Sequence, residues 1–250
     1  MAHKGAVLAL LAAAATATVA NADILYATSF EAAEGFVAGV DLDLHAPWVS
    51  TTFSGAAFIT DAIAVTGTQS VFFDAAPILS AWYWPSGGFD TGAPGADQIV
   101  HASVVMALED SADPSDRSLR WGFDMYNFDV EQIACIDFLD DDSIVFYDGA
   151  TDSFIDSGFI APRDFFYQLD IFMNFAADTV DYFVNGFPIG SATLGGGSEV
   201  FGDADLRVFG AGFDFAIFDD YLVETLPVPA PSAAGVLALA GLAAARRRRA

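Results

Sequence analysis

The chain has 250 residues, of which 54% are hydrophobic, so it is long enough and apolar enough to bury a sizeable core. Its formal net charge is −25, and the segment 23–226 has four arginines and no lysine against all 34 acidic residues, a net charge of −30. Such a surface repels nucleic acid and anionic lipid, which argues against nucleic-acid binding and predicts solubility in a salty or calcium-containing medium.

The first 22 residues have the parts of a secretory signal peptide. His3 and Lys4 form a basic start, an apolar stretch covers residues 6–15, and Ala20-Asn21-Ala22 supplies the small residues that signal peptidase needs. Cleavage is therefore expected after Ala22, before Asp23. A membrane anchor is the alternative, but the apolar stretch is short, rich in alanine and soon followed by small residues.

The body of the chain, residues 23–226, shows almost no helical periodicity. Apolar and polar residues alternate instead, which indicates half-buried strands. No linker rich in Pro, Gly or Ser divides it, so we expect one domain. Besides the hairpin described next, the alternation predicts strands at Ile24–Phe30, Ala62–Thr66, Ser70–Asp74, Ile99–Leu108, Leu119–Phe128, Gln132–Phe138, Ser143–Tyr147, Leu206–Phe209 and Phe213–Val223.

The clearest strand pair lies between residues 167 and 184. Alternation places one set of apolar side chains on a common face, and Asn185-Gly186 is a strong two-residue hairpin signal because both residues tolerate a positive φ. A third strand follows at 187–191. The side chains expected to be buried together are Tyr167, Leu169, Ile171, Val180, Tyr182 and Val184.

The C-terminal segment 227–250 has three parts. Val228-Pro229-Ala230-Pro231 is followed by an apolar run over 232–245 and then by Arg246, Arg247, Arg248 and Arg249. The apolar run is shorter than the roughly 20 residues that span a bilayer, and the arginines would hold its end at the cytoplasmic face.

This tail resembles the PEP-CTERM sorting signal of bacterial exported proteins, with Ala230 where the usual motif has glutamate. The resemblance implies transient anchoring in the inner membrane of a Gram-negative-type bacterium. It further implies cleavage by a sorting protease of the exosortase type and delivery to the cell surface or extracellular matrix. An ordinary hydrophobic anchor with a basic stop is the alternative.

Four motifs follow one another along the body. They are Ser29-Phe30-Glu31 with Gly35-Phe36 and Trp48, Leu119-Arg120-Trp121-Gly122-Phe123, the hairpin 167–186, and Phe218-Asp219-Asp220-Tyr221-Leu222-Val223. Their order resembles that in concanavalin A-like lectin/glucanase jelly rolls, which include laminin G-like domains. The resemblance implies an all-β, two-sheet antiparallel sandwich, a fold that carries sugar binders, glycoside hydrolases and structural modules alike.

The sequence shows no catalytic signature. Glycosidases of this fold place Glu-x-Asp-x-x-Glu or a similar motif on one strand, and none of the six glutamates frames an aspartate in that way. Lyases of similar shape need basic side chains that the body lacks. His45 and His101 belong to no zinc-ligand pattern, and Cys135 lies in an apolar run where a buried core residue is expected.

Calcium is the cofactor that the acidic residues suggest most readily, since its ligands are carboxylate and carbonyl oxygens. In similar jelly rolls a calcium ion ties the first strand region to the last, which implies Glu31 with Asp219 or Asp220. Strand alternation allows only one of these two aspartates to face the site. The run 140–142 is expected to be a solvated turn. Screening by salt, without any specific site, is the alternative explanation of the acidity.

A carbohydrate site would need exposed aromatic rings with nearby polar side chains. Trp82, Tyr83 and Trp84 are the best candidates, with the two tryptophans on one face of a strand and the tyrosine on the other. Burial of these rings in the core is the alternative.

Together these features predict an exported, non-catalytic surface or extracellular-matrix protein with a lectin-like domain able to bind extracellular polysaccharide. A structural matrix protein without a sugar site is one alternative, and a glycoside hydrolase or lyase of the same fold is another.

Overall fold

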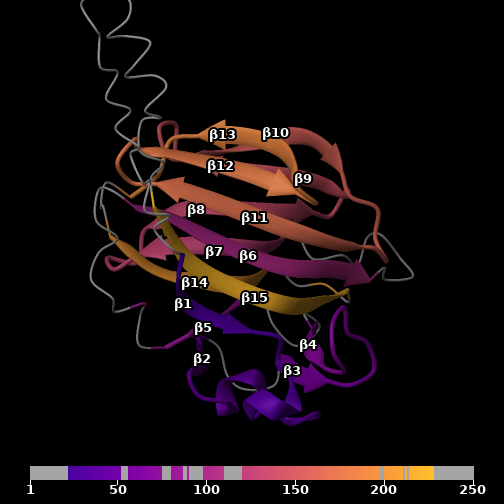
Figure 1. Ribbon diagram of the computed structural model, residues 1–250. Helices are drawn as coiled ribbons and strands as arrows, with labels where there is room; N and C mark the ends of the chain where they lie inside the picture. Colours follow the sequence, from indigo (N-terminus) through magenta and orange to yellow (C-terminus); the bar gives the residue numbers. More distant parts are fainter. Residues whose placement is uncertain are drawn as a thin grey trace, which may run out of the picture. The chain divides into compact units, whose positions relative to one another are not determined.

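The computed structural model shows two antiparallel sheets packed face to face (Figure 1). It describes residues 22–51, 56–74, 80–86, 89, 98–109, 120–196, 200–210, 212 and 214–227. Within these ranges every strand pairing is antiparallel, and the helical content is two short 3-10 turns, η1 (Ala32–Glu34) and η2 (Leu42–Leu44). The fold is thus the all-β, two-sheet antiparallel jelly-roll sandwich that the sequence predicts.

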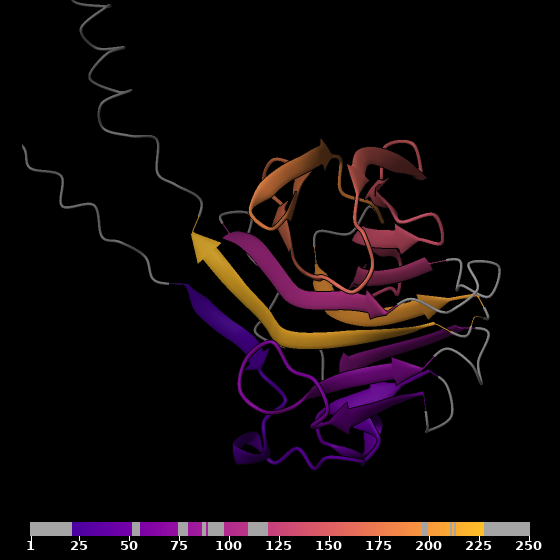
Figure 2. The same cartoon turned by 90° about the vertical axis from the view of Figure 1, so that its right-hand side faces the viewer.

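The first sheet has eight strands in the order β13-β12-β11-β6-β15-β4-β3, with β1 also paired to β15. The long strands β6 and β15 run side by side through its middle (Figure 2). Its strands are β1 (Asp23–Thr28), β3 (Ala57–Thr60), β4 (Ser70–Asp74), β6 (Gln98–Glu109), β11 (Phe166–Asn174), β12 (Thr179–Val184), β13 (Phe187–Ala192) and β15 (Phe215–Pro227).

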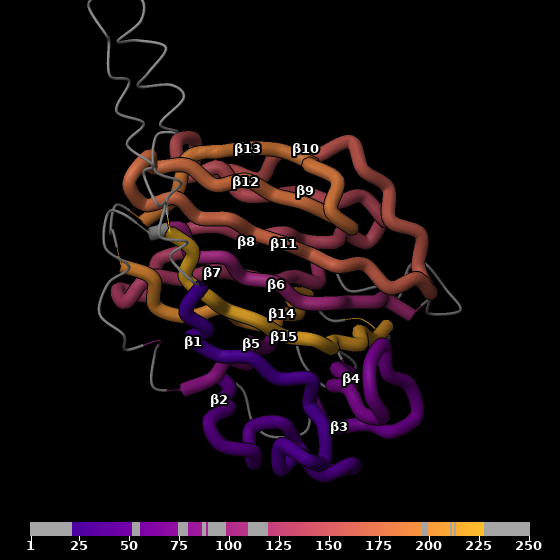
Figure 3. Tube along the Cα trace, viewed as in Figure 1, coloured from indigo at the N-terminus to yellow at the C-terminus, as the bar shows by residue number. Residues whose placement is uncertain are grey.

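The second sheet has seven strands in the order β10-β9-β8-β7-β14-β5-β2. The trace in Figure 3 shows the chain crossing repeatedly between the two sheets, so each sheet combines segments that are distant in sequence. Its strands are β2 (Trp48–Ser50), β5 (Ser80–Pro85), β7 (Arg120–Asn127), β8 (Gln132–Leu139), β9 (Ser143–Asp148), β10 (Ser153–Ile160) and β14 (Phe201–Phe209).

The predicted hairpin is confirmed. Strands β11 and β12 pair with Ile171 opposite Tyr182. Asn185 and Gly186, with φ values of 52° and 73°, form the two-residue turn to the third predicted strand, β13, where Val184 pairs with Phe187. All six side chains predicted to share this face are buried. The alternating pattern of this segment therefore reflects the burial of one of its faces against the second sheet.

Two tyrosines also tie the sheets to each other. The Tyr182 hydroxyl, on β12, donates a hydrogen bond of 2.7 Å to the carbonyl oxygen of Tyr147 on β9. The Tyr221 hydroxyl, on β15, donates one of 2.7 Å to the carbonyl oxygen of Ala204 on β14. Because an unpaired hydroxyl is costly in an apolar core, these bonds favour one relative position of the sheets.

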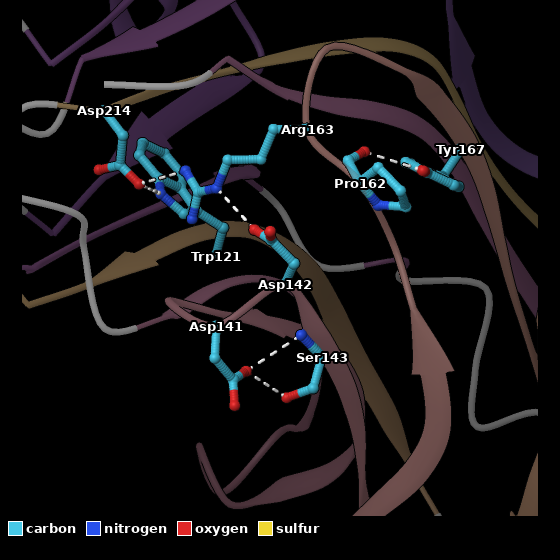
Figure 4. Close-up of polar contacts among 8 residues, drawn as sticks. All are labelled: Trp121, Asp141, Asp142, Ser143, Pro162, Arg163, Tyr167 and Asp214. Atoms are coloured by element: carbon cyan, nitrogen blue, oxygen red, sulfur yellow. Dashed lines mark hydrogen bonds and ion pairs between the residues drawn. The ribbon is translucent and has the colours of Figure 1, made fainter. Parts of the chain in front are cut away.

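A buried ion pair fixes the turn between β8 and β9 (Figure 4). Arg163 donates hydrogen bonds of 2.9 Å to Asp142, in the predicted turn 140–142, and of 2.9 Å to Asp214. The indole Nε1 of Trp121 donates to the same Asp214 oxygen at 3.0 Å. The cluster therefore anchors this acidic turn to a core tryptophan.

One predicted strand is wrong. Residues 62–66 form a loop, and their backbone amides are not available for a ladder. The N–H groups of Val65 and Thr66 donate instead to the carboxylate of Asp219, at 2.8 and 3.1 Å. Strand β10 was in turn not predicted, because most of its side chains are exposed and its sequence lacks a core-facing pattern.

The two terminal segments that the sequence predicts to be sorting signals lie largely outside the described residues. Residues 1–21 are not described, nor are Val228, Pro229, Ala230, Pro231 or Arg246–Arg249; Ala22 is the first described residue, and it is exposed. Among the residues that are described, no helix is long and apolar enough to span a membrane.

Truncating the hairpin core tests this architecture. Leu169→Ala should lower the free energy of unfolding by about 2–5 kcal/mol, because the cavity left between the sheets cannot fully collapse. Urea denaturation monitored by circular dichroism measures the change. Phe187→Ala, at a side chain that is 69% exposed on β13, is the control and should change stability by less than about 0.5 kcal/mol. Equal effects of the two substitutions would contradict the assignment.

Candidate functional site

A groove of about 300 Å³ lies on the outer face of the seven-stranded sheet. Because successive side chains of β5 point to opposite faces, Trp82 and Trp84 both line the groove. Tyr83, which the sequence groups with them, is turned into the core, where its ring lies 5.1 Å from that of Phe73, and it cannot reach a ligand. The lining residues are Thr51, Trp82, Trp84, Tyr126, Val130, Asp203 and Asp205.

The Trp82 ring is held in place by polar contacts. Its indole Nε1 donates to the Tyr126 hydroxyl at 3.1 Å, and that hydroxyl donates to Asp124 at 3.1 Å. The Arg207 guanidinium carbon lies 5.8 Å from the centre of the Trp82 ring, within cation–π range. Burial, with the charge of Asp124, raises the pKa of Tyr126, so the phenol remains a donor.

Beneath the groove lies a buried cluster of charged side chains from β7, β8 and β14. Arg207 forms an ion pair with Asp124, and it lies 3.9 Å from Asp137, to which Arg120 donates at 3.4 Å. Gly122 makes room for the cluster, since a Cβ atom there would lie 1.9 Å from a carboxylate oxygen of Asp137. The Asp137 carboxylate therefore occupies the space that a side chain at position 122 would need.

Two members of this cluster, together with Cys135, are close enough to one another to hold a metal ion. Ligand atoms of Asp124, Cys135 and Asp137 lie within 4.8 Å of one another. Burial, and then the charge of Asp124, raises the pKa of Asp137 to about 7, and burial raises that of the Cys135 thiol. Arg120 and Arg207 already neutralise the carboxylates and would repel a cation, so the cluster is an ion-pair network and not an open cation site. Asp124 Oδ1, Asp137 Oδ1 and Arg207 Nε nevertheless have no hydrogen-bond partner in the described part of the chain.

Two further carboxyl groups, from Asp203 and Asp205 on β14, face the groove. They lie within hydrogen-bonding reach of each other, and Asp205 also sits directly opposite Asp124 across the strand pair. Burial raises the pKa of Asp203 to about 6, and burial with these neighbouring charges raises that of Asp205. Near neutral pH the pair therefore shares one proton.

Asp124, Asp137, Asp203 and Asp205 together form the acidic floor of the groove, which the sequence did not predict. The expected pattern was glutamates spaced along one strand, whereas these carboxyl groups are aspartates on three strands. A usable signal was present in the alternation of Arg120, Gly122, Asp124 and Tyr126, and again in that of Asp203, Asp205 and Arg207. Charged residues at every second position of otherwise apolar strands indicate a polar face.

The predicted calcium ligands meet at one loop. Glu31 accepts hydrogen bonds from the N–H groups of Thr68 and Gln69 at 2.7 and 2.9 Å. Asp219 binds the same loop, as described above, and Asp220 accepts a hydrogen bond of 2.7 Å from the Thr66 hydroxyl.

Both of these aspartates reach the loop because the strand is irregular there. The register of β15 against β6 shifts between Asp219 and Leu222, and Asp220 has a φ of 48°. The expectation that only one of them could face the site assumed regular alternation and was wrong. Backbone hydrogen bonds from the loop lower the pKa of Glu31, whereas burial raises that of Asp219.

A larger hollow, of about 450 Å³, lies on the eight-stranded sheet, where Glu34, Ser103, Gln168 and Asp220 contribute to its lining. Its single aromatic residue, Tyr221, is buried and offers no ring surface to a ligand. The groove beside Trp82 combines aromatic surface with carboxyl groups, so it is the stronger candidate.

His101 is not available as a catalytic base. Its Nε2 lies 3.0 Å from Asp170 and its Nδ1 lies 2.9 Å from Glu224, while its ring stacks on that of Phe172. Burial lowers the pKa of His101, but the two carboxylates outweigh that effect and raise it. Both ring nitrogens are therefore engaged in holding β6, β11 and β15 together.

Comparison with known proteins shows similarity of fold alone. No family model matches the chain. No curated protein matches it either. Among solved structures, the conserved carbohydrate esterase vb_24B_21 from Shiga toxin-encoding bacteriophage phi24B has a TM-score of 0.59 at 12% identity, covering 82% of this chain and 99% of that one.

Two longer structures also match the chain. The binding domain of Paraclostridial Mosquitocidal Protein 1 has a TM-score of 0.50 at 13% identity, covering 86% of this chain and 51% of that one. A sialidase has a TM-score of 0.49 at 10% identity, covering 70% of this chain and 17% of that one. The chain thus spans about half of the former and a sixth of the latter. Identities this low carry no assignment of activity.

The loop between β3 and β4 allows specific calcium binding to be distinguished from non-specific screening of the acidic surface by salt. The Glu31 oxygens keep lone pairs that a cation could use, so we predict that millimolar calcium raises the melting temperature in 1 M sodium chloride. Sodium at that concentration already screens surface charges beyond roughly 3 Å. Glu31→Gln should abolish the calcium increment. If calcium adds nothing in high sodium, these carboxylates bind only the loop.

Proposed function

We propose that the groove beside Trp82 and Trp84 binds carbohydrate. The observation that carries this proposal is that two indole rings and a pair of carboxyl groups line one cavity on the outer face of a sheet. Indole rings stack against the apolar faces of sugar rings, and carboxyl groups bond to sugar hydroxyls. A single cavity thus has groups that match both the apolar faces and the hydroxyl groups of a sugar.

The groove is also organised before a ligand arrives. The bond from Trp82 to Tyr126 and the nearby Arg207 guanidinium hold the indole in place, so little side-chain freedom is lost on binding. This support comes from three different strands, β5, β7 and β14. Rigid elements of this kind position binding residues more accurately than loops do.

The role we propose is non-catalytic. Glycosidases need two carboxyl groups roughly 5–9.5 Å apart, so that an acid and a nucleophile or base act on opposite sides of the bond. Asp203 and Asp205 are in hydrogen-bonding contact, so they act as one acidic group. Asp124 is paired with Arg207 beneath the groove, and Tyr126 is held protonated.

Removing the aromatic surface tests the proposal. A glycan array probed with the protein should identify a bound oligosaccharide, and Trp82→Ala should weaken its binding at least about tenfold in isothermal titration calorimetry. A tenfold loss corresponds to about 1.4 kcal/mol, close to the value of one aromatic contact. Phe187→Ala, on the other sheet, is the control and should leave the affinity unchanged. Binding that survives the loss of Trp82 would contradict the proposal.

We further propose that the chain is exported and sorted, with the groove presented at the cell surface or in the extracellular matrix. The two terminal segments support this proposal through their basic, apolar and small-residue parts. The strongly acidic body fits an exposed, ion-rich surrounding. Its single cysteine can form no intrachain disulfide, so the fold does not depend on one.

Mass spectrometry of the protein isolated from its natural source tests this route. The mature chain should begin at Asp23 and should lack Arg246–Arg249, because a signal peptidase and a sorting protease have acted on it. Purified inner membrane, in which the uncleaved precursor should be found, is the control fraction. Surface protein that keeps all four arginines would overturn the sorting proposal.

A further inference from the structure

The groove contains acidic groups and no basic one. Among the described residues that line it, Asp203 and Asp205 are the only ones with acidic or basic side chains apart from the phenol of Tyr126. The nearest arginine, Arg207, is committed to Asp124 below the groove. A ligand in the groove therefore meets negative charge that Arg207, two residues from Asp205 on the same face of β14, offsets only in part.

The acidic pair also lacks donors. Asp205 is only 5% exposed, yet its Oδ1 atom accepts no hydrogen bond from any N–H or O–H group in the described part of the chain, and the same is true of Asp203 Oδ1. Buried carboxyl oxygens are normally bonded to donors. Here the two groups have only each other and the proton that they share.

We infer that the ligand of this groove is a cationic glycan, an amino sugar with a free ammonium group held by Asp203 and Asp205. The inference rests on the proposed function and specifies its substrate class. An ammonium group carries a positive charge and three donors, which match the unpartnered oxygens of the pair. The attached sugar ring then lies against Trp82 and Trp84, whose π faces also attract a cation.

The same geometry disfavours other ligands. A uronate or sulfated sugar would bring negative charge to a negative floor, and an N-acetylated sugar would leave the carboxyl oxygens without a charged donor. Calcium needs six to eight oxygen ligands, and two touching carboxyl groups supply few of them. A basic peptide would satisfy Asp203 and Asp205 but would leave the two indole faces without a ring to stack on.

Four oligomers of equal length distinguish these ligands. Isothermal titration calorimetry of the protein at pH 7 and 0.15 M salt would use a β-1,4-linked glucosamine pentamer, its fully N-acetylated counterpart, pentagalacturonate and pentalysine. The glucosamine pentamer should bind at least about tenfold more tightly than each of the others. Equal binding of the N-acetylated pentamer would overturn the inference and leave the proposed function standing. Absence of binding by every glycan overturns both.

Attraction to the acidic surface as a whole needs its own control. Asp203→Asn/Asp205→Asn should remove the preference for the ammonium form. Because this pair carries one net negative charge near neutral pH, the matched control is Asp181→Asn, which removes one charge from an exposed side chain of β12, on the other sheet. The second variant should keep the full preference. Equal losses in the two variants, or pentalysine binding as tightly as the glucosamine pentamer, would assign the effect to net charge and overturn the inference.

A folding defect would not obscure the result. If the double variant at the groove melts below the assay temperature, Asp203→Asn alone changes the more exposed member of the pair and keeps Asp205 in place. That variant should lose at least about fivefold of the preference for the glucosamine pentamer. Trp82→Ala should weaken both the glucosamine and the N-acetylated pentamer, since stacking does not depend on the charge. An unchanged preference in Asp203→Asn overturns the inference.

Discussion

The scarcity of basic side chains is the constraint on which this structure depends. Each of the three arginines in the described part of the body neutralises buried aspartates: Arg120 and Arg207 at the cluster beneath the groove, and Arg163 at the turn after β8. Breaking a buried pair of this kind costs about 3–5 kcal/mol, because the remaining charge is left without a partner. None of these arginines is therefore free to serve a ligand.

Other acidic groups are satisfied without any cation. Glu31 and Asp219 accept hydrogen bonds from backbone N–H groups of one loop. Because these N–H groups bind carboxylates, they do not take part in a strand ladder. Asp203 and Asp205 use a shared proton instead, which their burial makes favourable. Backbone donors suit positions beside a loop, whereas a shared proton is the remaining solution within a sheet, where the N–H groups already belong to the ladder.

Sequence reasoning succeeded where the decisive interactions are local. Strands β11, β12 and β13 could be predicted because their alternation and the Asn185-Gly186 turn between β12 and β13 lie close together in the sequence. The loop at 62–66 could not, since Asp219, which binds its amides, is 153 residues further along the chain from Thr66. Within the site, strand alternation alone predicted that Trp82 and Trp84 share a face. The acidic floor could not be predicted, because its aspartates come from strands that are neighbours only in the folded sheet.

The ion pairs and the groove are parts of one arrangement. Arg207 neutralises Asp124, the Asp124 carboxylate accepts the Tyr126 hydroxyl, and that hydroxyl accepts the indole N–H of Trp82. The same guanidinium lies near the Trp82 ring and so supports it directly. Because Arg207, the one arginine near the Trp82 ring, is paired with Asp124 by this chain of contacts, it offsets only part of the negative charge of the carboxyl groups beside the rings. The network that stabilises the seven-stranded sheet thereby also sets the charge that a ligand must carry.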